Sequence, residues 1–357
     1  MPSPSPGVGL TVVPVVGVGE VAAGADLAGL LLDALTASGV GLRPGDCLVV
    51  SSKVVSKSLG LTWTGPREDA VAAGTVRVVA ERRSADGVTR VVESAAGPVM
   101  AAAGVDASNT GPSAQLLVLP DDPDAEATRL RAGLLGRLGM PSATALAVVL
   151  SDTAGRPWRD GLTDLALGSS GLAVLEDLRG GTDHDGRPLA VTMRALADEV
   201  AGAANLVKGK ADGIPAALVR GLDAAWFSAD AAGARALVRV GPGDWFALGH
   251  VEAVRAALGV TAGSAQSEAV GIPSVQPGEP LAVRAGRVVA LALLDVPEGS
   301  ADVGVDAATG TAEVTLGATD DYDLGRLVVR CQVAAAAEGL TATLVGRAST
   351  TVTVALG

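Results

Sequence analysis

The chain contains four lysines, and they fall in two short clusters: Lys53 with Lys57, and Lys208 with Lys210. Arginine supplies the other positively charged side chains. An ammonium group is a compact point charge that suits phosphate contacts. The first cluster belongs to Ser51-Ser-Lys-Val-Val-Ser-Lys57, directly after a short apolar run. Hydroxyls and ammoniums at the end of an expected strand favour a phosphate site, and a solvated polar turn is the alternative interpretation.

Oxygen ligands follow a second apolar run, residues 145–150, in Ser151-Asp152-Thr153. A carboxylate and a hydroxyl at such an edge can hold Mg²⁺ or Mn²⁺ beside phosphates, because hard cations prefer oxygen ligands. Asp106 and Asn109 could serve a metal and a nucleotide, while an Asx turn or a helix cap is the more ordinary role for that spacing. We therefore expect a metal and nucleotide site built on these segments.

Two arginines, Arg156 and Arg159, flank Trp158. This grouping suits an anionic, planar ligand, although Trp158 could equally fill a core between solvated arginines. Gly17 to Ala22 matches the G-x-G-x-x-A form of a dinucleotide loop only weakly, and the sequence has no Walker A pattern. Nucleotide binding would therefore need another architecture.

The composition limits the classes of function. The net charge of −12 argues against nucleic acid as a general partner. No apolar run reaches the roughly 18 residues that a membrane span needs, and the N-terminus lacks the features of a signal peptide. Cys47 and Cys331 lie in apolar segments, so we expect both to be reduced core residues of a cytoplasmic protein.

Apolar periodicity and turn signals predict an α+β fold, an irregular mixed α/β arrangement without a steady βαβ rhythm. Strands are expected at residues 11–16, 47–50, 89–93, 116–119, 145–150 and 216–219. Helices are expected at residues 27–35, capped by Asp26, and at 67–83, 125–138 and 194–207.

Near Val240-Gly-Pro-Gly-Asp244 the composition changes to glycine and proline, so we expect one domain over residues 1–240 and a small C-terminal α/β domain over 241–357. In the second, helices are expected at 251–258 and 323–338, and strands at 288–294, 312–316, 341–345 and 350–355.

Four segments, taken in chain order, resemble the coenzyme F420-0:L-glutamate ligase (F420 gamma-glutamyl ligase) family. They are Val50-Ser-Ser-Lys-Val-Val-Ser-Lys57, Ala103-Gly-Val-Asp-Ala-Ser-Asn109, Ser151-Asp-Thr-Ala-Gly-Arg-Pro-Trp-Arg159 and Leu206-Val-Lys-Gly-Lys210. The resemblance runs continuously over about residues 12–221. Four ordered motifs are far more specific than any one of them alone.

The resemblance implies a GTP-dependent ligase that joins L-glutamate to coenzyme F420-0, or to its dehydro precursor, through an acyl phosphate. It also implies two divalent ions, Mg²⁺ or Mn²⁺, allows K⁺ as a further ion, and implies a homodimer. From the net charge and the hydropathy, we expect neither nucleic acid nor a membrane as a partner. By resemblance, GTP contacts come from Val18, Gly19, Glu20, Val21, Ser52, Lys57, Asn109, Lys208 and Gly209, metal ligands are Asp106, Asp152 and Thr153, and catalytic roles fall to Asp152, Arg156 and Arg159.

Two departures accompany the resemblance. Some members have Gln or Glu where this chain has Lys210, and a charged lysine cannot be a metal ligand. The segment from Asp244 to Gly249 resembles the junction to a nitroreductase-like domain, but the arginine-rich entry for a flavin phosphate is missing. We therefore expect residues 241–357 to be a shrunken nitroreductase-like remnant, or an unrelated cap, without FMN. The alternatives are a bifunctional ligase and flavin-dependent reductase, and a non-catalytic GTP-binding relative.

Overall fold

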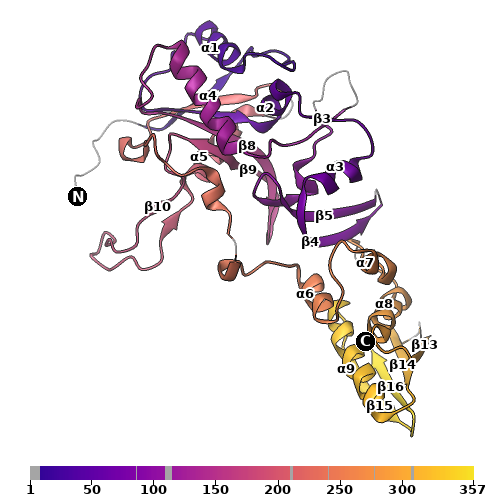
Figure 1. Ribbon diagram of the computed structural model, residues 1–357. Helices are drawn as coiled ribbons and strands as arrows, with labels where there is room; N and C mark the ends of the chain where they lie inside the picture. Colours follow the sequence, from indigo (N-terminus) through magenta and orange to yellow (C-terminus); the bar gives the residue numbers. More distant parts are fainter. Residues whose placement is uncertain are drawn as a thin grey trace. The chain divides into compact units, whose positions relative to one another are not determined.

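The computed structural model describes residues 9–85, 87–108, 115–209, 212–239, 241–276, 278–306 and 309–357. The chain forms two compact units (Figure 1). The first contains Met1–Val76 and Glu93–Gly241, and the second contains Arg77–Val92 and Pro242–Gly357. The second unit thus includes a segment from the N-terminal half of the chain as well as the C-terminal part.

A five-stranded sheet forms the centre of the first unit, in the order β1-β12-β2-β8-β9. Strands β2 and β8 are parallel, and every other neighbouring pair is antiparallel. The strands are β1 (Thr11–Val15), β12 (Ala216–Arg220), β2 (Asp46–Ser51), β8 (Leu146–Arg156) and β9 (Arg159–Ser170). The sheet is therefore mixed, and the predicted α+β class is confirmed.

Helices cover both faces of this sheet (Figure 1). Helices α1 (Leu27–Ala37) and α4 (Pro123–Arg137) pack on one face, and α5 (Leu196–Lys208) packs on the other. Successive residues of β8 alternate between the two cores: Val148 and Leu150 face α1 and α4, whereas Val149 faces α5. Burial on both faces explains why the middle of β8 is continuously apolar.

Shorter elements complete the first unit, and the last of them, Gly241–Gly243, crosses the boundary to the second. They are α2 (Ser52–Leu59), β3 (Thr62–Trp63), α3 (Arg67–Ala73), β6 (Val99–Ala101), β7 (Leu116–Leu117), β10 (Glu176–Asp177), β11 (Met193–Arg194) and the 3₁₀ turns Ala102–Gly104, Ala224–Trp226, Ala234–Leu237 and Gly241–Gly243.

The second unit contains an antiparallel sheet in the order β13-β14-β16-β15. Helices α8 and α9 share an apolar core with this sheet, and most of the paired strands β4 and β5, from Arg77 to Val92, also belongs to the unit. The elements are β4 (Thr75–Ser84), β5 (Gly87–Ser94), α6 (His250–Ala257), α7 (Ala265–Val270), α8 (Leu281–Leu293), β13 (Ser300–Asp306), β14 (Thr311–Gly317), α9 (Asp321–Ala337), β15 (Ala342–Arg347) and β16 (Thr351–Leu356).

Two predicted elements are wrong. The helix expected at residues 67–83 ends at Ala73, and Thr75–Ser84 forms β4, because its β-branched residues favour a strand. The strand expected at 288–294 is the end of α8, since its apolar residues also recur at helical spacing. By contrast, α1 begins as predicted, with the Asp26 carboxylate accepting a hydrogen bond from Gly29 N.

Both cysteines are buried and free, which confirms their expected place in the core. Burial raises the pKa of the Cys331 thiol to about 11 and raises that of Cys47 still further. Neither thiol is therefore poised for reaction. Among the described residues, no helix is long and apolar enough to cross a membrane.

Candidate functional site

The parallel strands β2 and β8 end side by side, and a cavity of about 370 Å³ opens at this edge of the sheet. Ser51 lies opposite Ser151 in the last pair of the ladder, and α2 begins at the next residue. Ser51 N donates to Pro215 O at 2.8 Å, which brings the segment before β12 to the same edge. The cavity is lined by Gly19, Glu20, Ser51, Lys53, Val54, Lys57, Ser151, Asp152, Thr153, Asp164, Asn205, Lys208, Gly209, Gly213, Ile214 and Pro215.

Lys53 connects the first turn of α2 to Asp106. Its Nζ forms an ion pair with the Asp106 carboxylate and donates to Ser108 Oγ at 2.7 Å. Ser108 N donates to Asp106 Oδ1 at 2.6 Å, which is the hydrogen bond of the Asx turn considered above. Burial alone would raise the pKa of Asp106, but the hydrogen bonds from Lys53 and Ser108 outweigh burial and lower it. Asp106 is therefore held ionised.

Asp152 lies beside Lys53 on the α2 side of β8. Removal from water raises the pKa of its carboxyl to about 6, against the opposing effects of Thr153 N–H, the Lys53 charge and the Ser52 hydroxyl. Ser52 Oγ is itself buried and has no hydrogen-bond partner of good geometry among the described residues. An under-compensated carboxylate and an unpaired hydroxyl are features that a bound cation would satisfy.

A second polar cluster lies on the α5 side of β8 and is centred on Asp164. Asp164 Oδ2 accepts from Ser151 Oγ at 2.8 Å and from Lys208 Nζ at 2.6 Å. Asp164 Oδ1 accepts from Thr153 Oγ1 at 2.8 Å. Asp164 and Lys208 are both buried. The cavity thus has charged side chains from both faces of the sheet.

Asp164 is a functional candidate that the sequence did not single out, and Ser151 was named there as part of the Ser151-Asp152-Thr153 motif without a role of its own. The register of the β8–β9 hairpin explains the omission for Asp164. At the tip Arg156 pairs with Arg159, and regular antiparallel pairing from there would place Leu162 opposite Thr153. A bulge between Gly155 and Arg156 shifts the register so that Asp164 takes this place. Hairpin bulges of this kind leave little trace in a sequence.

The predicted glycine loop lies beside α2. Lys57 Nζ donates to Glu20 Oε1 at 2.6 Å, and Gly19 has a φ of 71°, a conformation that favours glycine. The side chains of Val18 and Val21 are buried in the core with α1 and α4. Only the backbone at Val18 and Val21 is therefore available to a ligand, whereas Gly19, Glu20 and Lys57 line the cavity itself.

The predicted arginines lie apart from these groups. Arg156 and Arg159 face each other at the exposed tip of the β8–β9 hairpin and are not part of the cavity lining. Trp158 between them is 82% exposed, so the alternative interpretation of Trp158 as a core residue is wrong. Asn109 and Lys210 lie outside the described residues, and Gly209 lines the cavity next to Lys208.

The carboxylate and hydroxyl oxygens at this edge fit a divalent cation that is held partly by the protein and partly by a bound phosphate ligand. Within the described ranges, no group of three or more His, Cys, Asp or Glu side chains is arranged to hold a metal. Asp106 and Asp152 provide two carboxylates, and Mg²⁺ is commonly bound by one or two carboxylates together with phosphates and water. The Thr153 hydroxyl is on the other face of β8, where it donates to Asp164, so only its lone pairs remain for a cation.

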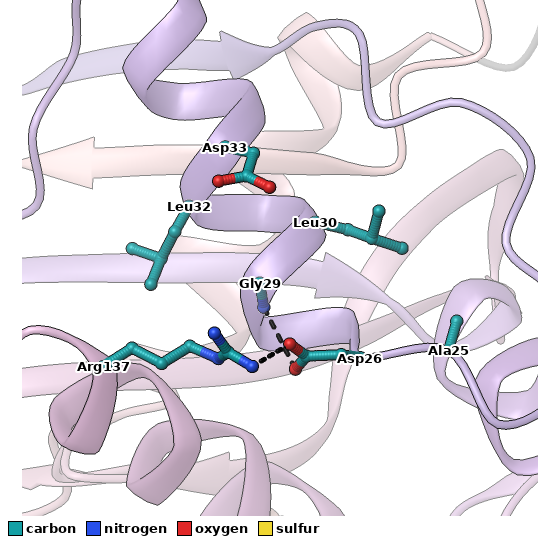
Figure 2. A pocket seen from close by; sticks show the side chains of 7 residues that line it. All are labelled: Ala25, Asp26, Gly29, Leu30, Leu32, Asp33 and Arg137. Atoms are coloured by element: carbon teal, nitrogen blue, oxygen red, sulfur yellow. Dashed lines mark hydrogen bonds and ion pairs between the residues drawn. The ribbon is translucent and has the colours of Figure 1, made fainter.

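A second hollow, of about 420 Å³, lies where α1 begins and α4 ends (Figure 2). Asp26 and Arg137 form an ion pair there, and the Asp26 carboxylate also caps α1 through Gly29 N. These polar groups are accounted for by helix capping and by the ion pair. The cavity at the ends of β2 and β8 is therefore the candidate site.

A strand-edge cavity with carboxylates, lysines and a helix N-terminus has the features of an enzyme site suited to an anion such as a phosphate. The sequence model of the family described as F420-0:Gamma-glutamyl ligase matches residues 16–221, and the chain belongs to this family. Coenzyme F420:L-glutamate ligase of Halobacterium salinarum is 40% identical over 226 residues, which cover 57% of this chain and 84% of the relative. The proteins of the same name from Natronomonas pharaonis and Halorubrum lacusprofundi are 38% and 36% identical over 226 residues, covering 57% of this chain and 83% and 84% of their own lengths.

Proposed function

We propose that the protein is a GTP-dependent ligase that forms a γ-glutamyl amide between L-glutamate and coenzyme F420-0, or its dehydro precursor, in F420 biosynthesis. Family membership and the names of the relatives support the reaction class. The observation that carries the proposal is the cavity at the ends of β2 and β8, which Lys53, Lys57 and Lys208 line together with Asp152. Glu20 and Asp164 also line this cavity, so the individual lysine ammoniums, rather than an excess of positive charge, would contact a triphosphate.

The chemistry follows from these groups. The acceptor carboxylate attacks the γ-phosphorus of GTP, and the bond from this phosphorus to the β-phosphate oxygen breaks. GDP is released, and the acceptor becomes an acyl phosphate. The glutamate amine then attacks the acyl carbon, phosphate leaves, and the amine proton passes to solvent. Both steps need positioning and charge neutralisation more than a protein nucleophile. The lysines and the orphan N–H groups at the start of α2 supply these locally.

Asp106 and Asp152 would hold Mg²⁺ or Mn²⁺, with Thr153 as a further oxygen ligand. When bound, a divalent cation neutralises the charge of the phosphates. Two such ions, and K⁺ as an additional ion, remain part of the proposal. Gly19, Glu20, Lys57, Lys208 and Gly209 would contact GTP directly, and Ser52 from the buried start of α2.

The proposal extends to the assembly and to the C-terminal part. We propose a cytoplasmic homodimer in which Arg156 and Arg159 act from the exposed hairpin tip. We also propose that residues 241–357 form a separate domain, a shrunken nitroreductase-like remnant without FMN. The small antiparallel sheet with α8 and α9 in the second unit supports a separate domain.

Mass spectrometry of the reaction product tests the proposed function. The purified protein is incubated with GTP, Mg²⁺ or Mn²⁺, L-glutamate and F420-0. A mass increase of one or more glutamyl residues, absent without GTP, is the expected result. An unchanged acceptor mass under all these conditions would contradict it.

A further inference from the structure

The Asp164 carboxylate is the hub of the buried cluster on the α5 side of the cavity. It is 5% exposed, and three side chains donate to it: Ser151, Thr153 and Lys208. Lys208 Nζ also donates to Ser151 Oγ at 2.5 Å. Since Asp164 lines the cavity together with all three donors, its bonds decide which of their atoms remain available to a ligand.

The donor count of Lys208 leaves one N–H uncommitted. An ammonium group has three donors and no acceptor. Two of the donors go to Ser151 Oγ and Asp164 Oδ2, and Lys208 makes no further hydrogen bond to any residue that the structure describes. The remaining N–H is available to an anion in the cavity.

The donor count of Thr153 has the opposite consequence. Its hydroxyl has one proton, which it donates to Asp164 Oδ1. The oxygen then offers only lone pairs to any further partner. In this orientation the Thr153 oxygen can bind a cation through a lone pair, but it cannot donate a hydrogen bond to a phosphate.

We propose that Asp164 is a positioning residue of this site. It anchors Lys208 so that one N–H is left for a phosphate oxygen, and it takes the Thr153 proton so that the Thr153 oxygen can accept a divalent cation. The inference rests on the proposed function in taking a nucleotide and a metal as the ligands. It adds a residue that acts through Thr153 and Lys208 rather than by touching either ligand.

Asp164→Asn would separate the two effects, because an asparagine side chain has one acceptor oxygen and one NH₂ group. Lys208 can only donate, so the oxygen must face Lys208, and the NH₂ must face Thr153. The Thr153 hydroxyl then has to turn round and accept. Asp164→Asn therefore keeps the Lys208 anchor but uses up a lone pair of Thr153, whereas Asp164→Ala removes both effects.

The test measures Mn²⁺ binding and GTP binding separately, each with one probe alone. We expect Asp164→Asn to weaken Mn²⁺ binding about 10- to 100-fold, the usual effect of losing a partner of a metal ligand. GTP affinity should stay within about threefold for Asp164→Asn and fall about tenfold for Asp164→Ala, one tenfold step being about 1.4 kcal/mol. Asp160→Asn, at an exposed position of the same strand, is the matched control and should leave both affinities unchanged.

A double-mutant cycle distinguishes positioning from general damage. Thr153→Val should weaken Mn²⁺ binding, and adding it to Asp164→Asn should cost little more, because both changes remove the same lone pair. Independent effects would add. Additive losses, or wild-type Mn²⁺ affinity in Asp164→Asn, would overturn the proposal.

Folding and the proposed function are checked independently. Because Asp164→Asn leaves Lys208 buried without a counter-charge, thermal unfolding is measured first. If that variant does not fold, Thr153→Ser and Thr153→Val are compared instead. We expect Thr153→Ser to bind Mn²⁺ as tightly as the wild type and Thr153→Val to bind it more weakly. Equal Mn²⁺ affinities of these two variants would overturn the inference. Failure of the wild type to form the amide would contradict the proposed function, while the binding measurements would still decide the role of Asp164.

Discussion

Ser51 and Ser151 lie opposite each other in the last pair of the parallel β2–β8 ladder. After Ser51 the chain enters α2 at Ser52, whereas after Ser151 strand β8 continues with Asp152. Since β2 stops and β8 continues, the edge of β8 opens to the cavity at this point. Side chains from both faces of β8 can therefore reach one ligand.

Asp152→Asn should abolish turnover and yet stabilise the metal-free fold near pH 7. Burial raises the pKa of Asp152 to about 6, above the value of about 3.9 in an unfolded chain. Ionisation therefore costs the folded state stability as pH rises from about 4 to above 6, by about 1–3 kcal/mol. Denaturant unfolding in EDTA should show this gain at about pH 7 and almost none at about pH 4. Equal stability of the two proteins at both pH values would contradict the burial argument.

Lys57→Ala should weaken GTP binding more than it slows the chemical step. Lys57 Nζ lies 2.6 Å from Glu20 Oε1 at the cavity wall, and its removal takes away a phosphate partner. We expect KM for GTP to rise about tenfold, or about 1.4 kcal/mol, with little change in kcat. Arg129→Ala on the surface of α4 is the control. A large loss of kcat with an unchanged KM would show instead that Lys57 stabilises the transition state rather than the bound GTP.

Arg159→Ala should affect the acceptor rather than the nucleotide. Arg159 lies at the exposed hairpin tip beside Trp158, outside the cavity. An exposed guanidinium next to an indole suits a planar anion. Steady-state kinetics should show a raised KM for F420-0 and an unchanged KM for GTP. The reverse pattern would show that the tip serves the nucleotide.

Glu338→Gln should destabilise the second unit. The Glu338 side chain is 2% exposed and accepts from Arg255 at 3.0 Å and from Arg287 at 2.6 Å. Removing its charge takes away the acidic partner of the buried Arg255 and leaves Arg287 with Glu279 alone, at a cost of about 3 kcal/mol. The free energy of unfolding of the full chain measures this loss. Glu313→Gln on an exposed position of β14 should have almost no effect, and a similar small effect at Glu338 would disprove the role of the network.

Much of the first unit could be predicted because its signals are local. The apolar run before Ser151 and the Asp26 cap each mark an element through neighbouring residues. One of the two failures has a non-local cause. Apolar residues of α8 fit a strand and a helix equally well, and only packing against α9 and the sheet decides. The other failure is local, because the β-branched residues after Ala73 favour a strand although the charges of the segment are compatible with a helix.

The same distinction applies to the candidate site. Lys53, Asp152 and Lys208 could be selected because they belong to short motifs with chemical meaning. Asp164 could not, because its position opposite Thr153 depends on a bulge in the hairpin. The burial of Val18 and Val21 was equally hidden, since it results from packing against α1 and α4.

GDP release from GTP in the presence of Mg²⁺ or Mn²⁺, with F420-0 and L-glutamate each added or omitted, tests the proposed ligase activity most directly. We expect rapid release only when both substrates are present, with about one GDP for each glutamyl unit gained. GTP binding without any release that depends on the two substrates would contradict it and would indicate a non-catalytic GTP-binding relative.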